Sequence, residues 1–113
     1  MTAERLVSFN QAWQRGDVGA LRRFLHPYVE YWPLGGELVH GREAVLRRFA
    51  RHFSAAKSSE VSFERPILSG SLGVCRWRLA GRTVDGASFE IEGVDLYRFA
   101  GDLISSKDVY QKA

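Results

Sequence analysis

The sequence predicts an α+β fold in which three N-terminal helices lie on the concave face of a cone-shaped, curved antiparallel sheet. Apolar residues recur at helical spacing in the first half of the chain. The second half contains long segments rich in β-branched and aromatic residues, and glycines separate these segments as in hairpin-linked strands. Because 113 residues are enough for one domain and too few for two, we expect a single domain over residues 1–113.

The first half of the chain predicts three helices, near residues 2–15, 17–26 and 41–54. In the first, apolar residues from Leu6 to Trp13 recur at helical spacing, and Gly16 should end the helix. Asp17 can then cap the second helix, which Pro27 should end. The third follows a glycine and carries apolar residues on one face and arginines on the other.

Strands are expected in the remaining segments. A short strand should occupy residues 28–32, and the longer ones residues 60–68, 72–80, 87–99 and 103–111. Helices followed by a run of hairpin-linked strands indicate an antiparallel sheet with the helices on one face.

Composition excludes several classes of partner. The net charge of +3 comes from 16 basic and 13 acidic residues, and no basic stripe is interleaved with aromatic residues, so we expect no nucleic-acid partner. No segment approaches the roughly 20 apolar residues of a membrane span, and no signal peptide is apparent, so we expect a cytoplasmic protein without a membrane partner. The single cysteine, Cys75, lies in an apolar run and is interpreted as a packed thiol.

The segment at 87–99 places one carboxylate among apolar residues. Strand residues alternate between two faces, and the face that carries Asp95 is otherwise apolar or aromatic from Phe89 to Phe99. Asp95 should therefore point to the core side of the sheet, where a carboxylate is costly unless it is paired, hydrogen-bonded or protonated. Asp95 is the first candidate for a catalytic residue.

The following turn predicts a second acid beside it. Gly101 and Asp102 are expected to form a two-residue hairpin loop, with glycine first as a type II′ turn prefers. That register places Asp95 opposite Asp108, with Cβ atoms about 4.5–5.5 Å apart. One of two such acids should have a raised pKa, which suits general acid/base catalysis. The predicted catalytic pair is Asp95 and Asp108, with Tyr97, Ser106 and Tyr110 around it.

The assignments of the acid pair and of the pocket residues both depend on which face of the sheet each strand residue occupies. If the pairing slips by one residue, Asp108 turns outward beside Lys107 and becomes an ordinary surface acid. In the short first strand, Tyr28, Glu30 and Trp32 share one side. If Trp32 faces the pocket, so does Glu30, which is then a third candidate acid.

A single pocket is expected between the helix stripes and the inward face of the sheet. The residues expected to contact a small apolar ligand there are Trp13, Trp32, Trp77, Phe89, Tyr97 and Tyr110. No short metal-ligand spacing connects the three histidines, so we expect no metal and no cofactor. Of these histidines, His26 is expected at a helix C-terminus, His40 in a loop and His52 on a helix surface.

Two segments resemble a known family. The segments FNQAWQRGDVGALRRFLHPYVEYWPLGGELVHGREAVLRRF and VDLYRFAGDLISSKDVY resemble the nuclear transport factor 2-like superfamily, in its SnoaL-like polyketide cyclase and ketosteroid isomerase-like branch. The matching features are an aromatic-x-x-x-W-x-x-G-D step, a G-R-E-A helix start and a D-x-Y-R-F-x-G-D-x-I hairpin. The resemblance covers nearly the whole chain and implies the cone-shaped fold.

The resemblance gives Asp95 a possible role. Asp95 falls where ketosteroid isomerases keep the protonated acid of their oxyanion hole. Their general base and oxyanion tyrosine would fall at Trp32 and Phe9, so the resemblance does not imply steroid isomerisation. Asp108 falls where limonene epoxide hydrolases carry an acid, but the strand around Arg76 has no second acid.

Three functions remain open at this stage, the third of which is an accessory domain of a larger complex. The first is a cofactor-independent isomerase, cyclase or hydratase that acts on an apolar, carbonyl-bearing molecule. The second is a non-catalytic ligand-binding or assembly module of the same fold. A homodimer is expected in each case, because the outward sheet face carries apolar residues among charged ones and the resemblance implies back-to-back dimers. The apolar residues assigned to that face are Val94, Leu96 and Val109.

Overall fold

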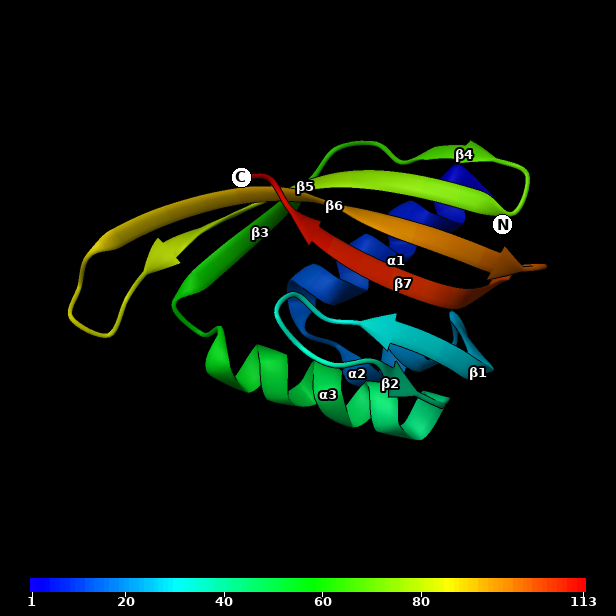
Figure 1. Ribbon diagram of the computed structural model, residues 1–113, viewed down its shortest axis with the longest axis horizontal. Coiled ribbons are helices and arrows are strands. Elements are labelled where there is room, and N and C mark those ends of the chain that lie inside the picture. Colours follow the sequence, from blue (N-terminus) through cyan, green and yellow to red (C-terminus); the bar gives the residue numbers. More distant parts are fainter.

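Helices cover one face of a curved, open sheet, which confirms the predicted α+β fold. The computed structural model describes all 113 residues (Figure 1). The helices are α1 (Ala3–Arg15), α2 (Val18–Arg22) and α3 (Arg42–Ala55). The strands are β1 (Leu25–Trp32), β2 (Val39–His40), β3 (Ser59–Phe63), β4 (Ile67–Ser69), β5 (Leu72–Arg82), β6 (Ser88–Ala100) and β7 (Leu103–Gln111).

The boundary between α1 and α2 follows the predicted signals. Gly16 ends α1 with a left-handed backbone at φ 63°, where a side chain would be strained. The Asp17 carboxylate then accepts a hydrogen bond from the backbone N–H of Ala20 at 3.0 Å and caps α2. This turn places the end of α1 beside α3, where Phe53 packs against Gly16.

Helix α2 is shorter than predicted. It ends at Arg22, and the chain is already extended at Leu25, so His26 lies in β1 instead of closing a helix. Proline disfavours helical backbone angles at the residue before it, and His26 precedes Pro27. The Nδ1 atom of His26 accepts a hydrogen bond from the backbone N–H of Tyr28 at 3.1 Å.

The sheet is mixed, so the prediction of a wholly antiparallel sheet is wrong. Its order is β2-β1-β7-β6-β5-β3, with β4 beside β5, and β1 runs parallel to β7. The strands after α3 include the β5–β6 and β6–β7 hairpins, which must be antiparallel. Strand β1 precedes α3 and joins β7 from far away in the sequence, so no hairpin dictates its direction.

The hairpin between β6 and β7 has the predicted turn but a different register beyond it. Ala100 pairs with Leu103, and Gly101 has a φ of 60°, as a tight two-residue loop requires. Between the pairs Phe99–Ile104 and Arg98–Ser106, however, the chain carries one extra residue, Ser105. This β-bulge shifts every later pair by one residue.

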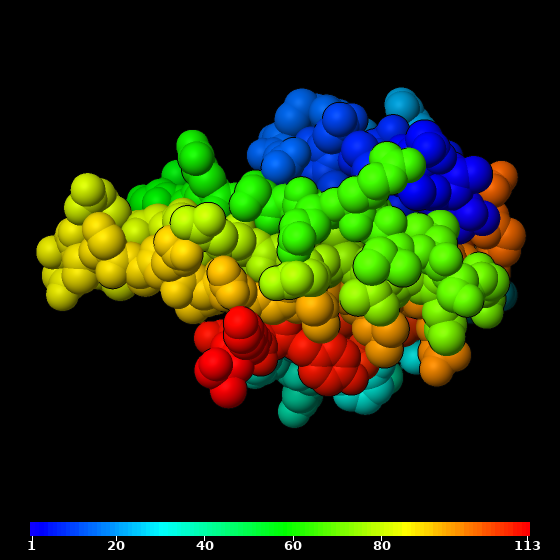
Figure 2. Space-filling model, turned by 90° about the horizontal axis from the view of Figure 1, so that it is seen from above, coloured from blue at the N-terminus to red at the C-terminus, as the bar shows by residue number.

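One part of the sheet packs against the helices, and the other part projects beyond them as an arm. Buried residues of α1, α3 and the inner faces of β1, β5, β6 and β7 form one apolar cluster. The far ends of β5 and β6 extend past the helices as a hairpin, which projects from the body in Figure 2. Val84 at its tip is fully exposed. No helix is both long enough and apolar enough to cross a membrane.

Candidate functional site

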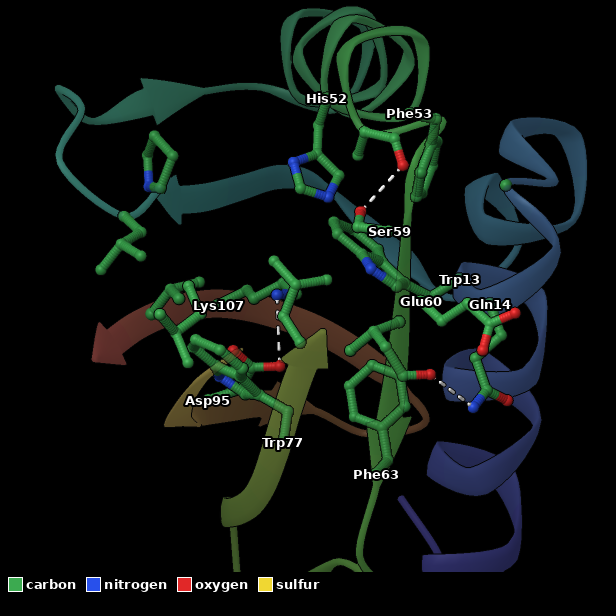
Figure 3. Close-up of a pocket in the computed structure, with 18 of the residues that line it drawn as sticks. Trp13, Gln14, His52, Phe53, Ser59, Glu60, Phe63, Trp77, Asp95 and Lys107 are labelled. Carbon is green, nitrogen blue, oxygen red and sulfur yellow. Dashed lines mark hydrogen bonds and ion pairs between the residues drawn. The ribbon is translucent and has the colours of Figure 1, made fainter. Parts of the chain in front are cut away.

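A cavity of about 700 Å³ lies between the inner face of the sheet and helices α1 and α3 (Figure 3). Of its 22 lining residues, 11 are hydrophobic. The exposed charged residues Arg15, Lys57 and Glu60 mark the side that opens to solvent, which we call the entrance. The aromatic lining residues are Trp13, Tyr31, Phe53, Phe63 and Trp77. Asp95 of β6 and Lys107 of β7 also line the cavity.

A buried ion pair lies at the floor of the cavity. Lys107 Nζ is 3.4 Å from Asp95 Oδ2, and each residue is only 3% exposed. The Tyr97 hydroxyl donates a hydrogen bond to the same carboxylate oxygen at 3.3 Å. Figure 3 shows the ammonium and the carboxylate facing each other across β6 and β7. Each charge has the partner that a buried charge needs.

Aromatic rings surround the Lys107 ammonium. Its Nζ lies 4.6 Å from the centre of a Trp13 ring, 5.4 Å from that of Tyr31 and 5.8 Å from that of Tyr97. Cations over the faces of aromatic rings are stabilised by the ring quadrupole. These contacts hold a buried ammonium, and electrostatic interactions are stronger at a buried site than in water.

Asp95 is held in the same environment. Burial raises its pKa, while the Lys107 ammonium and the hydrogen bonds around the carboxylate act in the opposite direction. The Trp77 indole lies beside the carboxylate and also lowers its pKa, although its buried Nε1 has no hydrogen-bond partner of standard geometry. The balance of these effects leaves the pKa of Asp95 above its ordinary value, with burial as the largest cause.

His52 adds a neutral base to the same cavity. It projects from α3, is half-buried and lies 5.3 Å from Trp13, ring centre to ring centre. Burial lowers its pKa, and the positive charges of Lys107 and Arg48 lower it further. The imidazole is therefore uncharged near neutral pH and can accept a proton.

Four predicted site residues lie elsewhere. Asp95 pairs with Val109, not Asp108, so Asp108 lies on the outer face of the sheet with Tyr110, whose hydroxyl donates to its carboxylate at 2.7 Å. Trp32 pairs with Asp108 on the same outer face and is 42% exposed. Phe89, on the projecting arm, does not line the cavity. The predicted pairing of Asp95 with Asp108 is therefore wrong, and so are the three pocket positions Trp32, Phe89 and Tyr110.

The remaining predicted residues lie at or under the cavity. Trp13 and Trp77 line it, and Tyr97 is fully buried below it with its hydroxyl on Asp95. Glu30 shares the exposed side of β1 with Trp32, so it is not a third pocket acid. The inward residue at this end of the strand is Tyr31, because Val29 and Tyr31 are buried and Glu30 and Trp32 are exposed.

Sequence reasoning missed Lys107, His52 and Tyr31. The alternating pattern of β7 would have placed Lys107 inward only if the bulge at Ser105 had been known. His52 was assigned to the helix surface, but it lies three residues after the buried Phe49 on the pocket side of α3. No group of three or more possible metal ligands comes together in the protein.

The chain belongs to the SnoaL-like domain family, whose model matches residues 6–107. A search of curated proteins finds no match to the sequence. A nuclear transport factor 2-like protein of unknown function from Cytophaga hutchinsonii is 19% identical, covers 99% of this chain and 100% of its own, and superposes with a TM-score of 0.83.

Two further solved structures have the same fold. A protein designated a SnoaL-like polyketide cyclase, from Jannaschia sp. CCS1, is 16% identical over 96% of this chain and 85% of its own, with a TM-score of 0.80. A protein with a ketosteroid isomerase-like fold from Catenulispora acidiphila, in complex with trimethylamine, is 20% identical over 97% of this chain and 86% of its own, with a TM-score of 0.81. These structural similarities establish the fold.

Proposed function

We propose that this SnoaL-like protein binds an apolar carbonyl compound and transfers a proton at the carbon beside the carbonyl group. The observation that carries this proposal is the buried Lys107–Asp95 pair at the floor of an aromatic cavity. A buried cation in a fixed position is suited to stabilise the negative charge that develops on a carbonyl oxygen when a neighbouring proton is removed. The relatives with polyketide cyclase and ketosteroid isomerase-like folds are consistent with this class.

The proposed roles follow from the chemistry of each side chain. Lys107 donates a hydrogen bond to the carbonyl oxygen, and the neutral His52 accepts the proton from the adjacent carbon. The C–H bond breaks as the N–H bond forms, and the electron pair moves onto the oxygen as an enolate. Return of this proton from His52 to a conjugated carbon completes an isomerisation without an external reactant, whereas its return to the same carbon gives only hydrogen exchange.

Asp95 keeps the cation in place. Its carboxylate compensates the charge of Lys107 and aims the ammonium, and its own position is fixed by the Tyr97 hydroxyl. The raised pKa of Asp95 is consistent with the acid role that its position on the inner face of the sheet predicted. Trp13 and Trp77 are the residues proposed to pack on the substrate.

A non-catalytic binding module is the second candidate. The observation that favours it is that Asp95 and Lys107 already satisfy each other and are almost fully buried. In that case the same aromatic cavity would bind a small molecule, and the ion pair would fix the shape of the floor without entering the chemistry.

Hydrogen–deuterium exchange into 2-tetralone separates the two candidates. The protons beside its carbonyl group are acidic, and their loss in D₂O is followed directly by proton NMR. The wild-type protein should accelerate this loss by about tenfold or more, and His52→Gln should remove most of the acceleration. Arg51→Gln, on the same helix but outside the cavity, is the control. Binding of 2-tetralone without acceleration would contradict the enzyme proposal and favour the binding module.

We also propose that the protein dimerises through the outer face of its sheet. Trp32, Leu96 and Val74 lie in one row across four strands on that face, with Asp108 between the first two. Val109 was assigned to this face, but it lines the cavity.

Light scattering should give the mass of a dimer for the wild type and of a monomer for Val74→Lys. Val84→Lys, on the projecting arm, should remain dimeric, and a monomeric wild type would contradict the proposal.

A further inference from the structure

We infer that the pocket selects carbonyl compounds that carry a carboxylate, which the cations at its entrance bind. This inference rests on the proposed function and concerns the substrate class of the same site. The carbonyl group would meet Lys107 at the floor, and the carboxylate would remain near the entrance.

The residues that line the cavity carry more positive than negative charges. The lining cations are Arg15, Arg48, Lys57 and Lys107, and the lining anions are Glu60 and Asp95. Lys107 and Asp95 compensate each other at the floor. The entrance is therefore left with three cations and one anion, and a negatively charged group there would be attracted.

Two of the entrance cations have no carboxylate partner, whereas several surface arginines do. Outside the cavity, Arg65, Arg76 and Arg78 each lie within 2.9 Å of a glutamate. Arg48 and Lys57, in contrast, form no ion pair within 4.0 Å.

The remaining entrance cation is only weakly paired. Arg15 reaches Asp17 at 4.0 Å, and both side chains are about half-exposed. A pair of this kind contributes little. All three entrance cations are thus available to a ligand.

Arg48 has the best position of the three. It is half-buried on α3, one turn before His52, and residues four apart share a helix face. Its charge is close enough to His52 to lower the pKa of that imidazole, which places the guanidinium near the proposed base. A planar guanidinium can bind a carboxylate through two parallel hydrogen bonds.

The ligand class follows from the two ends of the cavity. The aromatic walls between floor and entrance favour a flat cyclic body. One end of this body would present a carbonyl oxygen to Lys107, and the other a carboxylate to Arg48. Lys57 and Arg15 strengthen the attraction without the burial that would fix a geometry.

Calorimetry with two isosteric probes tests this inference. 2-Naphthoate and 2-naphthamide have the same ring system and nearly the same shape, but only the first carries a charge. We expect 2-naphthoate to bind about tenfold more tightly, which corresponds to about 1.4 kcal/mol. Arg48→Gln should weaken the binding of 2-naphthoate by about five- to tenfold and that of 2-naphthamide by less. The preference should also decrease at high salt.

Arg51→Gln is the matched control, because Arg51 is an arginine of the same helix that does not line the cavity. It should leave both affinities unchanged. Equal affinities for the two probes, an equal effect of Arg48→Gln and Arg51→Gln, or no binding of 2-naphthoate would overturn the inference. The 2-tetralone exchange assay contains no carboxylate, so it tests the proposed proton transfer separately. Acceleration of that exchange without a preference for 2-naphthoate would leave the proposed function standing and refute the carboxylate site.

Discussion

Lys107 faces Asp95 because one residue, Ser105, bulges out of the ladder between β6 and β7. Without the bulge, Asp108 would pair with Asp95 and Lys107 would point outward. With it, Lys107 pairs with Tyr97 and its Nζ reaches 3.4 Å from Asp95 Oδ2. A single residue thus converts a site with two acids into one with a compensated charge.

The first prediction concerns the stability of this ion pair. Asp95→Leu and Lys107→Met should each lower the free energy of unfolding by about 3–5 kcal/mol, because each leaves a buried charge without its partner. The double variant should be close to the wild type or more stable, since two apolar residues replace two charges that had to be desolvated. Urea unfolding of the four proteins gives the coupling energy directly.

The exposed pair of Lys112 and Glu92 is the control for that cycle. These groups lie 3.8 Å apart with side chains 70% and 45% exposed, so Lys112→Met should change stability by less than about 1 kcal/mol. If the double variant lost as much stability as the sum of the two single variants, the two buried charges would not be coupled.

The second prediction concerns the titration of His52. Its pKa in the folded protein is lowered, so its contribution to stability is present above the ordinary value of 6.5 and is lost as the pH falls through the lowered pKa. His52→Gln should therefore reduce the loss of stability on acidification in that window. NMR titration of the imidazole should show a higher pKa in Arg48→Gln than in the wild type, and no change in Arg51→Gln. An imidazole that titrates at or above the ordinary value would contradict this.

Local signals predicted most of the fold. Helix caps at Asp17 and Gly16 and the turn at Gly101 act within a few residues, so they can be read from the sequence. The inward direction of Asp95 followed from strand alternation and is confirmed by its burial. The parallel pairing of β1 with β7 depends on residues about 75 positions apart, and no local signal specifies it.

The site was harder to predict because strand faces depend on register. Ser105 lies in a Ser-Ser pair that gives no sign of a bulge, yet it determines which of Lys107 and Asp108 faces the cavity. In β1 the alternating pattern fits either face, since Tyr31 and Trp32 are both aromatic. Tertiary packing against Phe49 selects Tyr31, and this contact cannot be seen in the sequence.

The third prediction concerns the reactivity of Cys75. Burial raises the pKa of this thiol to about 11, with a smaller contribution in the same direction from the Asp95 charge, and the hydrogen bond from Asn10 opposes both. Because the thiolate is the reactive form, Ellman's reagent should not label the native protein at about pH 8. The same protein unfolded in guanidinium should react with one equivalent of the reagent. Rapid labelling of the native protein would show that Cys75 is accessible.

The last prediction concerns Gly93, which lies opposite Trp77 in the ladder of β5 and β6. A Cβ atom at this position would overlap the Trp77 indole and the backbone oxygen of Tyr110. The backbone cannot easily move within a paired strand, so Gly93→Ala should destabilise the protein by about 1–3 kcal/mol and displace Trp77 from the cavity wall. Gly19→Ala is the control, because its nearest neighbour is a flexible carboxylate at 3.6 Å and alanine is the better helix former, so it should be neutral or stabilising. Urea unfolding measures both effects, and Trp fluorescence reports the displacement. Equal stability of the two variants would mean that the indole does not pack on Gly93.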